Sequence, residues 1–155
     1  MAKIVTGDRV AKQARLRIGC TAAIFNPTRD KILLTRRSDN GLWCLPGGGM
    51  DAGETAAECC EREVWEETGL MVKAKRLIGI YTTPHVLVEY RDGTKAQIVA
   101  MLFEVEIIGG QAGLSNEVTE YGYFNADESV KLELMYHHRE RIADIFAQRE
   151  AAFLK

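Results

Sequence analysis

This 155-residue sequence lacks three features: long apolar runs, a large excess of positive or negative charge, and cysteine pairs spaced to bind a metal. No apolar stretch approaches the roughly 20 residues that a membrane-spanning helix requires. The N-terminal segment also holds no apolar stretch of the kind found in signal peptides. We therefore expect a cytoplasmic protein that does not enter a membrane.

The charge of the chain is nearly balanced, with 20 basic and 22 acidic residues and a net charge of −2. The strongly positive field that is typical of nucleic-acid-binding proteins is therefore absent. Apolar residues make up 46% of the sequence and charged residues 27%, which excludes a disordered or fibrous chain. We expect one domain over residues 1–155, with a polar arm over residues 1–15.

Cysteine is present, but not in a pattern that indicates metal or redox chemistry. The four cysteines are Cys20, Cys44, Cys59 and Cys60. None is spaced as a zinc pair or as a Cys-x-x-Cys motif, and side chains of adjacent residues on a helix diverge. We interpret all four as small, buried, apolar residues in a reducing compartment.

Two helices and several strands are indicated by the hydrophobic patterns and the turn residues. Thr55 and Glu58 form a capping box at the start of a helix that runs to Thr68, and Gly69 is a good left-handed terminator. A second helix is expected over residues 136–153. Strands are expected at residues 18–25, 31–35, 77–81, 86–90, 97–107 and 121–124. This order predicts a mixed α/β fold in which helices cover a sheet.

Three carboxylates gather on one face of the first helix. At about 100° per residue, Glu67 lies about 40° from Glu63, and Glu66 about 60° from it in the other direction. Like charges at this spacing repel one another, and a hard divalent cation such as Mg²⁺ would resolve the repulsion. The glycines at 47–49 are interpreted as a loop before the helix, where backbone can approach a ligand closely. The alternative is a solvated face on which Arg62 pairs with neighbouring glutamates.

The spacing around these acids is more specific than the acids alone. Gly48 is followed after five residues by Glu54, and after seven more by the segment Arg62-Glu63-Val64-Trp65-Glu66-Glu67-Thr68-Gly69-Leu70. This pattern resembles the signature of the Nudix (MutT-like) hydrolases at every fixed position, over 23 residues. The segment Leu42 to Gly49, which leads into it, is also similar to the family. The resemblance implies a Nudix-type α/β/α sandwich with a mixed sheet, a catalytic loop–helix–loop and a C-terminal helix.

The resemblance also implies an activity and a division of roles. Members of the family use Mg²⁺ or Mn²⁺ to hydrolyse a nucleoside diphosphate linked to another moiety. Glu63 and Glu67 would be the main metal ligands, and Glu66 would join them or hold a bridging water. The Gly48 carbonyl would be a further ligand. Arg62 would pair with a neighbouring glutamate and fix its direction.

The base that takes the proton of the attacking water varies within the family. Here the candidates are Glu66, Glu117 and Glu120. The last two stand just before an aromatic segment, where members often carry such a glutamate, and the alternative for them is a solvated loop acid. Glu54 is expected to brace the loop against the helix rather than to act in catalysis.

Phosphate contacts and stacking residues are predicted less directly. Arg36 and Arg37 end a strand near the glycine loop, and either could meet a phosphate, as could the backbone of Gly47 and Gly49. Strand alternation sends the two arginines to opposite faces. The aromatic residues that could stack on a base, or else lie in the core, are Trp43, Tyr81 and Tyr90. The histidines are His85, His137 and His138. We expect no catalytic histidine, and we place the adjacent pair on a wet helix surface.

Several functions share this signature. The first interpretation is a metal-dependent pyrophosphohydrolase of a small nucleotide, with ADP-ribose, nucleotide sugars, dinucleoside polyphosphates and (d)NTPs as open alternatives. A second is an RNA 5′-pyrophosphohydrolase, which predicts a basic track that the sequence does not support. A third is a non-catalytic nucleotide-sensing module, which the full set of glutamates disfavours. An isomerase on the same fold is weaker, because no additional catalytic-cysteine motif is evident. A homodimer, with the N-terminal arm as an exchange element, is compatible with the resemblance.

Overall fold

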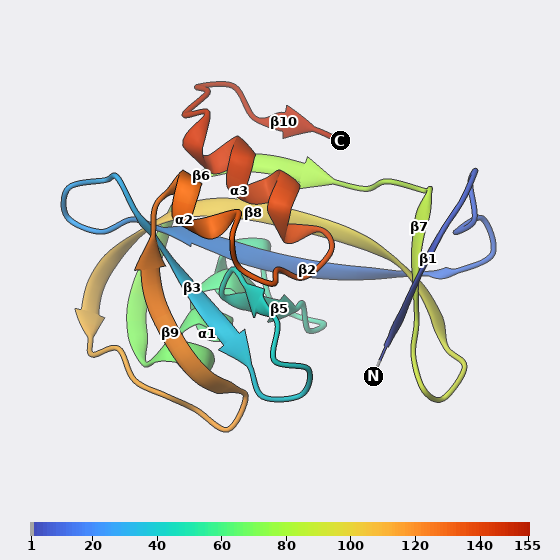
Figure 1. Cartoon of the computed structure of the whole chain (residues 1–155), viewed down its shortest axis with the longest axis horizontal. Coiled ribbons are helices and arrows are strands. Elements are labelled where there is room, and N and C mark those ends of the chain that lie inside the picture. The colour runs from blue at the N-terminus through green and yellow to red at the C-terminus, as the bar shows by residue number, and fades with distance from the viewer. Residues whose placement is uncertain (1) are drawn as a thin grey trace.

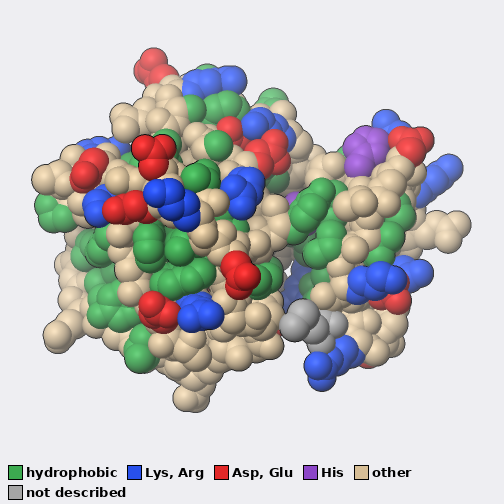
Figure 2. Space-filling view, viewed as in Figure 1, with side chains coloured by type: hydrophobic (Ala, Val, Ile, Leu, Met, Phe, Trp, Pro, Cys, Tyr) green, Lys and Arg blue, Asp and Glu red, His purple; other side chains and the backbone are tan. Residues whose placement is uncertain are grey.

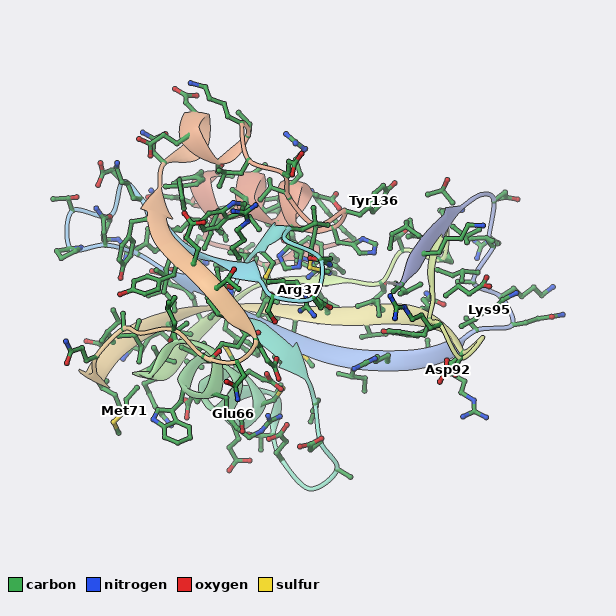
Figure 3. The ribbon with its side chains drawn as sticks, turned by 60° about the horizontal axis from the view of Figure 1, so that its bottom comes forward. Arg37, Glu66, Met71, Asp92, Lys95 and Tyr136 are labelled. Atoms are coloured by element: carbon green, nitrogen blue, oxygen red, sulfur yellow. The ribbon has the colours of Figure 1, made fainter. Side chains whose placement is uncertain are left out.

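The computed structural model describes residues 2–155 and contains a seven-stranded sheet and a three-stranded sheet (Figure 1). The strands are β1 (Lys3–Thr6), β2 (Arg15–Ile24), β3 (Ile32–Arg37), β4 (Trp43–Cys44), β5 (Gly47–Gly49), β6 (Leu70–Tyr81), β7 (Val86–Glu89), β8 (Lys95–Gly110), β9 (Val118–Phe124) and β10 (Phe153–Leu154). The helices are α1 (Ala56–Thr68), α2 (Ala126–Ser129) and α3 (His138–Phe146). Helix α3 lies on one side of the long strands β2 and β8, and α1 lies on the other (Figure 3). This confirms the predicted sandwich.

The centre of the larger sheet is the parallel pair β2 and β8, in register from Arg15 opposite Ala96 to Ile24 opposite Val105. Strands β6 and β7 run antiparallel to β8 along its other edge, and β1 runs antiparallel to β7. The sheet is therefore mixed, as predicted. In the smaller sheet, β3 lies between β4 and β9 and is antiparallel to both.

The glycine segment 47–49 forms a short strand rather than the expected loop. β5 pairs antiparallel with β2, and Gly48 lies opposite Cys20. Gly47 adopts a φ of +146°, and a Cβ atom there would collide with the backbone of Cys20 and Thr21. Glycine has a low strand propensity, so the local pattern does not indicate a pairing that depends on the absence of side chains.

Two hydrophobic clusters hold the helices on the sheet. Under α1, Cys60 and Val64 pack against Ile24 and Leu33. On the opposite face, Ile142 of α3 packs in a separate cluster with residues of the central strands. All four cysteines are free thiols and are buried, which confirms their interpretation as core residues.

The ends of α1 are fixed by the capping chemistry that the sequence predicts. The Thr55 side chain accepts the N–H of Glu58, and the Glu58 carboxylate accepts the N–H of Thr55 at 2.7 Å. Gly69 ends the helix in the left-handed conformation, with a φ of +75°. The helix therefore begins shortly after β5 and presents a fixed face to it.

The expected helix over residues 136–153 is wrong in its second half. Helix α3 ends at Phe146, and Gln148 adopts a φ of +48°, which a helix does not allow. Phe153 and Leu154 instead form β10, which pairs in parallel with β6. That pairing joins segments far apart in the sequence, so the local apolar spacing could not show it.

The predicted N-terminal arm is partly structured. Within it, β1 pairs with β7, from Lys3 opposite Glu89 to Thr6 opposite Val86. We call the segment 3–6 together with residues 86–95 the β1–β7 lobe, which stands at one end of the long sheet (Figure 1). No helix within residues 2–155 has both the length and the apolar character that crossing a bilayer would require.

Candidate functional site

Strand β5 and helix α1 place backbone and carboxylate oxygens together without an intervening side chain. A Cβ atom on Gly48 would collide with the carboxylate of Glu63, so only glycine leaves this carboxylate against β5. One turn further along α1, Glu67 is 5% exposed, and its Oε2 accepts the N–H of Gly47 at 3.0 Å. The two glycines and two of the predicted glutamates thus form one compact arrangement.

The Arg62 side chain donates hydrogen bonds to several groups around this arrangement. Its Nε and Nη2 donate to the two carboxylate oxygens of Glu54, at 3.0 and 2.8 Å. Its Nη1 donates to Glu63 at 2.9 Å and to Glu66 at 3.3 Å. Its Nη2 also donates to the carbonyl of Gly49 at 3.0 Å. One guanidinium therefore ties the loop before α1 to the acidic face of the helix, with Glu54 in the bracing position that the sequence predicts.

The local environment changes the pKa of these acids in opposite directions. Burial raises the pKa of Glu67 to about 7; the negative charge of Glu63 adds to the rise, and the Gly47 hydrogen bond opposes it. Burial also raises the pKa of Glu63, against the effect of Arg62. The Arg62 hydrogen bonds instead lower the pKa of Glu54 to about 2. The site therefore combines Glu67, a buried carboxylate that ionises only near neutral pH, with Glu54, which is fully ionised there.

Glu117 acts electrostatically on two of the helix acids, whereas Glu120 pairs with an arginine. The negative charge of Glu117 contributes to the raised pKa of both Glu63 and Glu67. Glu120 on β9 is exposed and pairs with Arg36, at 3.3 Å between Nη1 and Oε2. Of the two candidate bases outside α1, the structure therefore brings Glu117 toward the site.

The two predicted phosphate-binding arginines separate as strand alternation predicts. Arg36 is exposed and donates through Nε to the carbonyl of Gly41 at 2.9 Å. Arg37 is half-buried, donates twice to Asp39 at 2.8 Å, and its charge acts on Glu67. Arg37 and Glu66 both lie in the central region of the molecule where β9 passes α1, away from Asp92 and Lys95 (Figure 3). Arg37 is thus the nearer of the two to the acids.

The donor set suits a hard cation, although the side chains do not form a closed metal cage. Among residues 2–155, no three His, Cys, Asp or Glu side chains lie close enough together to hold a metal ion. Arg62 occupies one oxygen of Glu63 and one of Glu66, and the Gly47 N–H occupies one oxygen of Glu67. Within the described contacts, the second oxygen of each of these three acids is left for a ligand. Carboxylate and carbonyl oxygens are the ligands that Mg²⁺ and Mn²⁺ prefer. The residues therefore fit such an ion by chemistry.

The predicted stacking residues Trp43 and Tyr81 and the histidine His138 are buried in the core. Trp43 is buried edge-on against Phe124, and Tyr81 is buried and donates to Asp144 at 2.9 Å. The expectation of a wet surface for both adjacent histidines is wrong for His138, which is 7% exposed and accepts the N–H of Leu45 at 2.9 Å through Nδ1. Leu45 stands two residues before Gly47, so His138 secures the approach to β5. The sequence gives no local signal for this long-range bond.

The chain is similar to known proteins along most of its length. The family model described as the NUDIX domain matches residues 15–145. An ADP-ribose pyrophosphatase of Methanocaldococcus jannaschii is 35% identical over 118 residues, which are 74% of this chain and 65% of that protein. A solved ADP-ribose pyrophosphatase from Streptococcus suis matches with a TM-score of 0.65 and 28% identity, covering 90% of this chain and 98% of that one. A solved MutT protein from Methanosarcina mazei matches with a TM-score of 0.72 and 26% identity, and the match covers 90% of this chain and 99% of that one.

Proposed function

Because the chain belongs to the NUDIX domain family, we propose that it is a divalent-metal-dependent pyrophosphohydrolase of nucleoside diphosphates linked to a second moiety. The observation that carries this proposal is the direct approach of the Glu63 carboxylate to Gly48. Oxygens from a strand and from a helix meet there, with the buried Glu67 beside them. Folding alone does not require this repulsive set, whereas a cation would stabilise it.

Glu63, Glu67 and the Gly48 carbonyl would hold Mg²⁺ or Mn²⁺, with Glu66 as an additional ligand. When bound, such an ion spreads the negative charge of the diphosphate and lowers the pKa of an attacking water. Arg62 does not need to touch the substrate in this proposal. It keeps the loop and the helix acids in fixed directions before the substrate arrives.

Two acids are placed to take the proton of the water. Glu66 projects from α1 with half of its side chain exposed, so solvent can carry the proton away. Glu117 approaches from the loop before β9 and acts electrostatically on both metal-site glutamates. We propose that one of these two is the general base, and that Arg37, and not Arg36, contacts a phosphate of the substrate.

ADP-ribose is the first substrate to test. The Methanocaldococcus jannaschii relative and the Streptococcus suis structure both carry the name ADP-ribose pyrophosphatase. The likeness to a Bacillus subtilis protein named putative 8-oxo-dGTP diphosphatase, 39% identical over 94 residues, supports oxidised (d)NTPs as the second candidate class. Location in the cytoplasm and a homodimer stay predictions from the sequence.

The test measures product release from ADP-ribose, a nucleotide sugar, a diadenosine polyphosphate, normal and oxidised dNTPs and 5′-triphosphate RNA, with Mg²⁺ or Mn²⁺. We expect metal-dependent turnover of ADP-ribose, its loss in Glu67→Gln, and its retention in Glu106→Gln. Glu106 is a suitable control because its side chain on β8 is exposed and, among residues 2–155, forms an ion pair with Lys75 alone. An absence of turnover on the whole panel, with metal bound calorimetrically, would favour the nucleotide-sensing module instead.

A further inference from the structure

A cavity of about 1030 Å³ lies on the α3 side of the sheet, between that helix and the β1–β7 lobe. Its walls come from β1, β6, β7, β8, α3 and the turn before α3, and none of the residues lining it belongs to β5 or α1. Figure 2 shows the furrow that separates the lobe from the main body. The cavity is large enough for a nucleotide-sized ligand.

Arg141 of α3 lines this cavity and is buried without a partner. The residue is 4% exposed, and its Nε has no hydrogen-bond acceptor within the part of the chain that the structure describes. Its guanidinium lies over the ring of Tyr81, 5.4 Å from the centroid. A buried guanidinium that lies over an aromatic face and has no acceptor for its Nε carries an unsatisfied donor, which is costly unless a ligand supplies the acceptor.

The acids nearest to Arg141 on its own helix are engaged by other cations and donors. Asp144 accepts the hydroxyl of Tyr81 at 2.9 Å and the ammonium of Lys155 at 3.0 Å. Glu140 pairs with the same ammonium at 3.2 Å. Burial lowers the pKa of Arg141 only to about 10, so it stays a cation at neutral pH. The positive charge at the wall of the cavity is therefore not neutralised internally.

We propose that this cavity is an anion subsite in which Arg141 binds a phosphate group of a nucleotide or a sugar phosphate. The planar fork of arginine matches two oxygens of a phosphate. Tyr136 and His137 line the same cavity, and Tyr136 is exposed on the side of α3 that faces the lobe (Figure 3), where a ring can cover a sugar or a base. A purely structural arginine would instead be expected to pair with Asp144 or Glu140.

The first test is calorimetric titration of the full chain with AMP and with adenosine in the presence of EDTA, so that the metal site does not contribute. We expect AMP to bind at least about 10-fold more tightly than adenosine, because charge-assisted hydrogen bonds are strong. Arg141→Met should abolish this difference, and Arg141→Lys should keep part of it. Arg91→Gln, on the exposed hairpin between β7 and β8, should leave it unchanged. Equal affinities of the wild-type protein for AMP and adenosine would overturn the proposal.

Thermal unfolding separates a ligand-binding arginine from a structural one. Without ligand, Arg141→Met should raise the Tm, because it replaces an unpartnered buried charge with an apolar side chain of similar length. AMP should raise the Tm of the wild-type protein and not that of the variant. A lower Tm for the ligand-free variant would mean that the stacking of Arg141 on Tyr81 is its function, and would contradict the subsite.

The phosphate could belong to the substrate or to a separate effector, and ADP-ribose kinetics distinguish these sources. If it belongs to the substrate, Arg141→Met raises KM about 10-fold while kcat changes little. If it belongs to an effector, KM is unchanged and added AMP alters the rate of the wild-type protein but not that of the variant. Unchanged KM together with the same response to AMP in both proteins would refute the subsite. Since the titration requires no turnover, its result is independent of the proposed hydrolysis.

Discussion

Arg62 and Glu54 form a two-point pair in which Nε and Nη2 of the guanidinium donate to the two oxygens of the carboxylate, at 3.0 and 2.8 Å. The same guanidinium reaches Glu63 through Nη1. The pair thus connects a loop acid to a helix acid through one rigid plane. Lysine cannot reproduce this connection, because its ammonium is a single point charge without a planar fork.

Arg62→Lys should therefore reduce metal-dependent turnover by about 10- to 100-fold, the usual range for losing a group that orients metal ligands. The helix should remain folded, because its caps do not involve Arg62. Steady-state kinetics against Mg²⁺ concentration, with circular dichroism as the folding control, would measure this. Wild-type kinetics in Arg62→Lys would show that the orientation of Glu63 does not depend on the guanidinium.

Gly48→Ala should displace the Glu63 carboxylate without unfolding the protein. The backbone of Gly48 does not have a positive φ, and the group that an added Cβ meets is the flexible end of Glu63. We expect at least about a 100-fold loss of turnover and only a small change in Tm. Gly113→Ala is the matched control, since a Cβ there meets nothing within 4 Å. Equal activity of the two variants would contradict the metal-site geometry.

Glu67→Gln should remove turnover while stabilising the metal-free protein near neutral pH. The folded pKa of about 7 exceeds the ordinary value of 4.5, so the unfolded chain ionises first as the pH rises. Ionisation of Glu67 thus lowers stability between pH 4.5 and 7, by an amount that grows to about 3 kcal/mol above that window. Urea unfolding of both proteins at pH 4.5 and 7.5 gives the difference. A variant that is less stable at pH 7.5 would show that Glu67 is structural.

His138 should make the protein sensitive to acid. Burial, together with the nearby charge of Arg141, holds the pKa of His138 well below its ordinary value of 6.5, so the folded protein keeps it neutral while the unfolded chain takes up a proton. Its contribution to stability is complete above pH 6.5 and falls by about 1.4 kcal/mol per pH unit below that value.

His138→Asn tests this contribution, because the amide oxygen can still accept the N–H of Leu45 and does not titrate. The variant should lose less stability than the wild-type protein between pH 7 and pH 5, as measured by chemical denaturation. Identical losses in both proteins would exclude His138 as the group responsible.

Local chemistry predicted α1 and its immediate surroundings well. Thr55, Glu58 and Gly69 act within a few residues of their own positions, so the sequence alone could place the ends of the helix. The relation between Glu63 and Glu67 also follows from helical periodicity. Arg36 and Arg37 separated as strand alternation predicts.

The features that the sequence did not reveal all depend on partners distant along the chain. β5 exists because β2 accepts a strand without side chains, and β10 exists because β6 offers a free edge. His138 is buried where it accepts the N–H of Leu45, which is remote in sequence. Arg141 stands on a helix whose first half the sequence predicted, but only the packing against Tyr81 shows that its guanidinium is enclosed.

The parallel pairing of β2 with β8 has a consequence for how the chain reaches its native state. Each residue of β2 is matched with one about 80 positions later, and contacts of such high sequence separation slow folding. During synthesis the apolar end of β2, Cys20 to Ile24, leaves the ribosome long before its partner strand exists. The centre of the sheet therefore forms late, and until then this segment needs protection from aggregation.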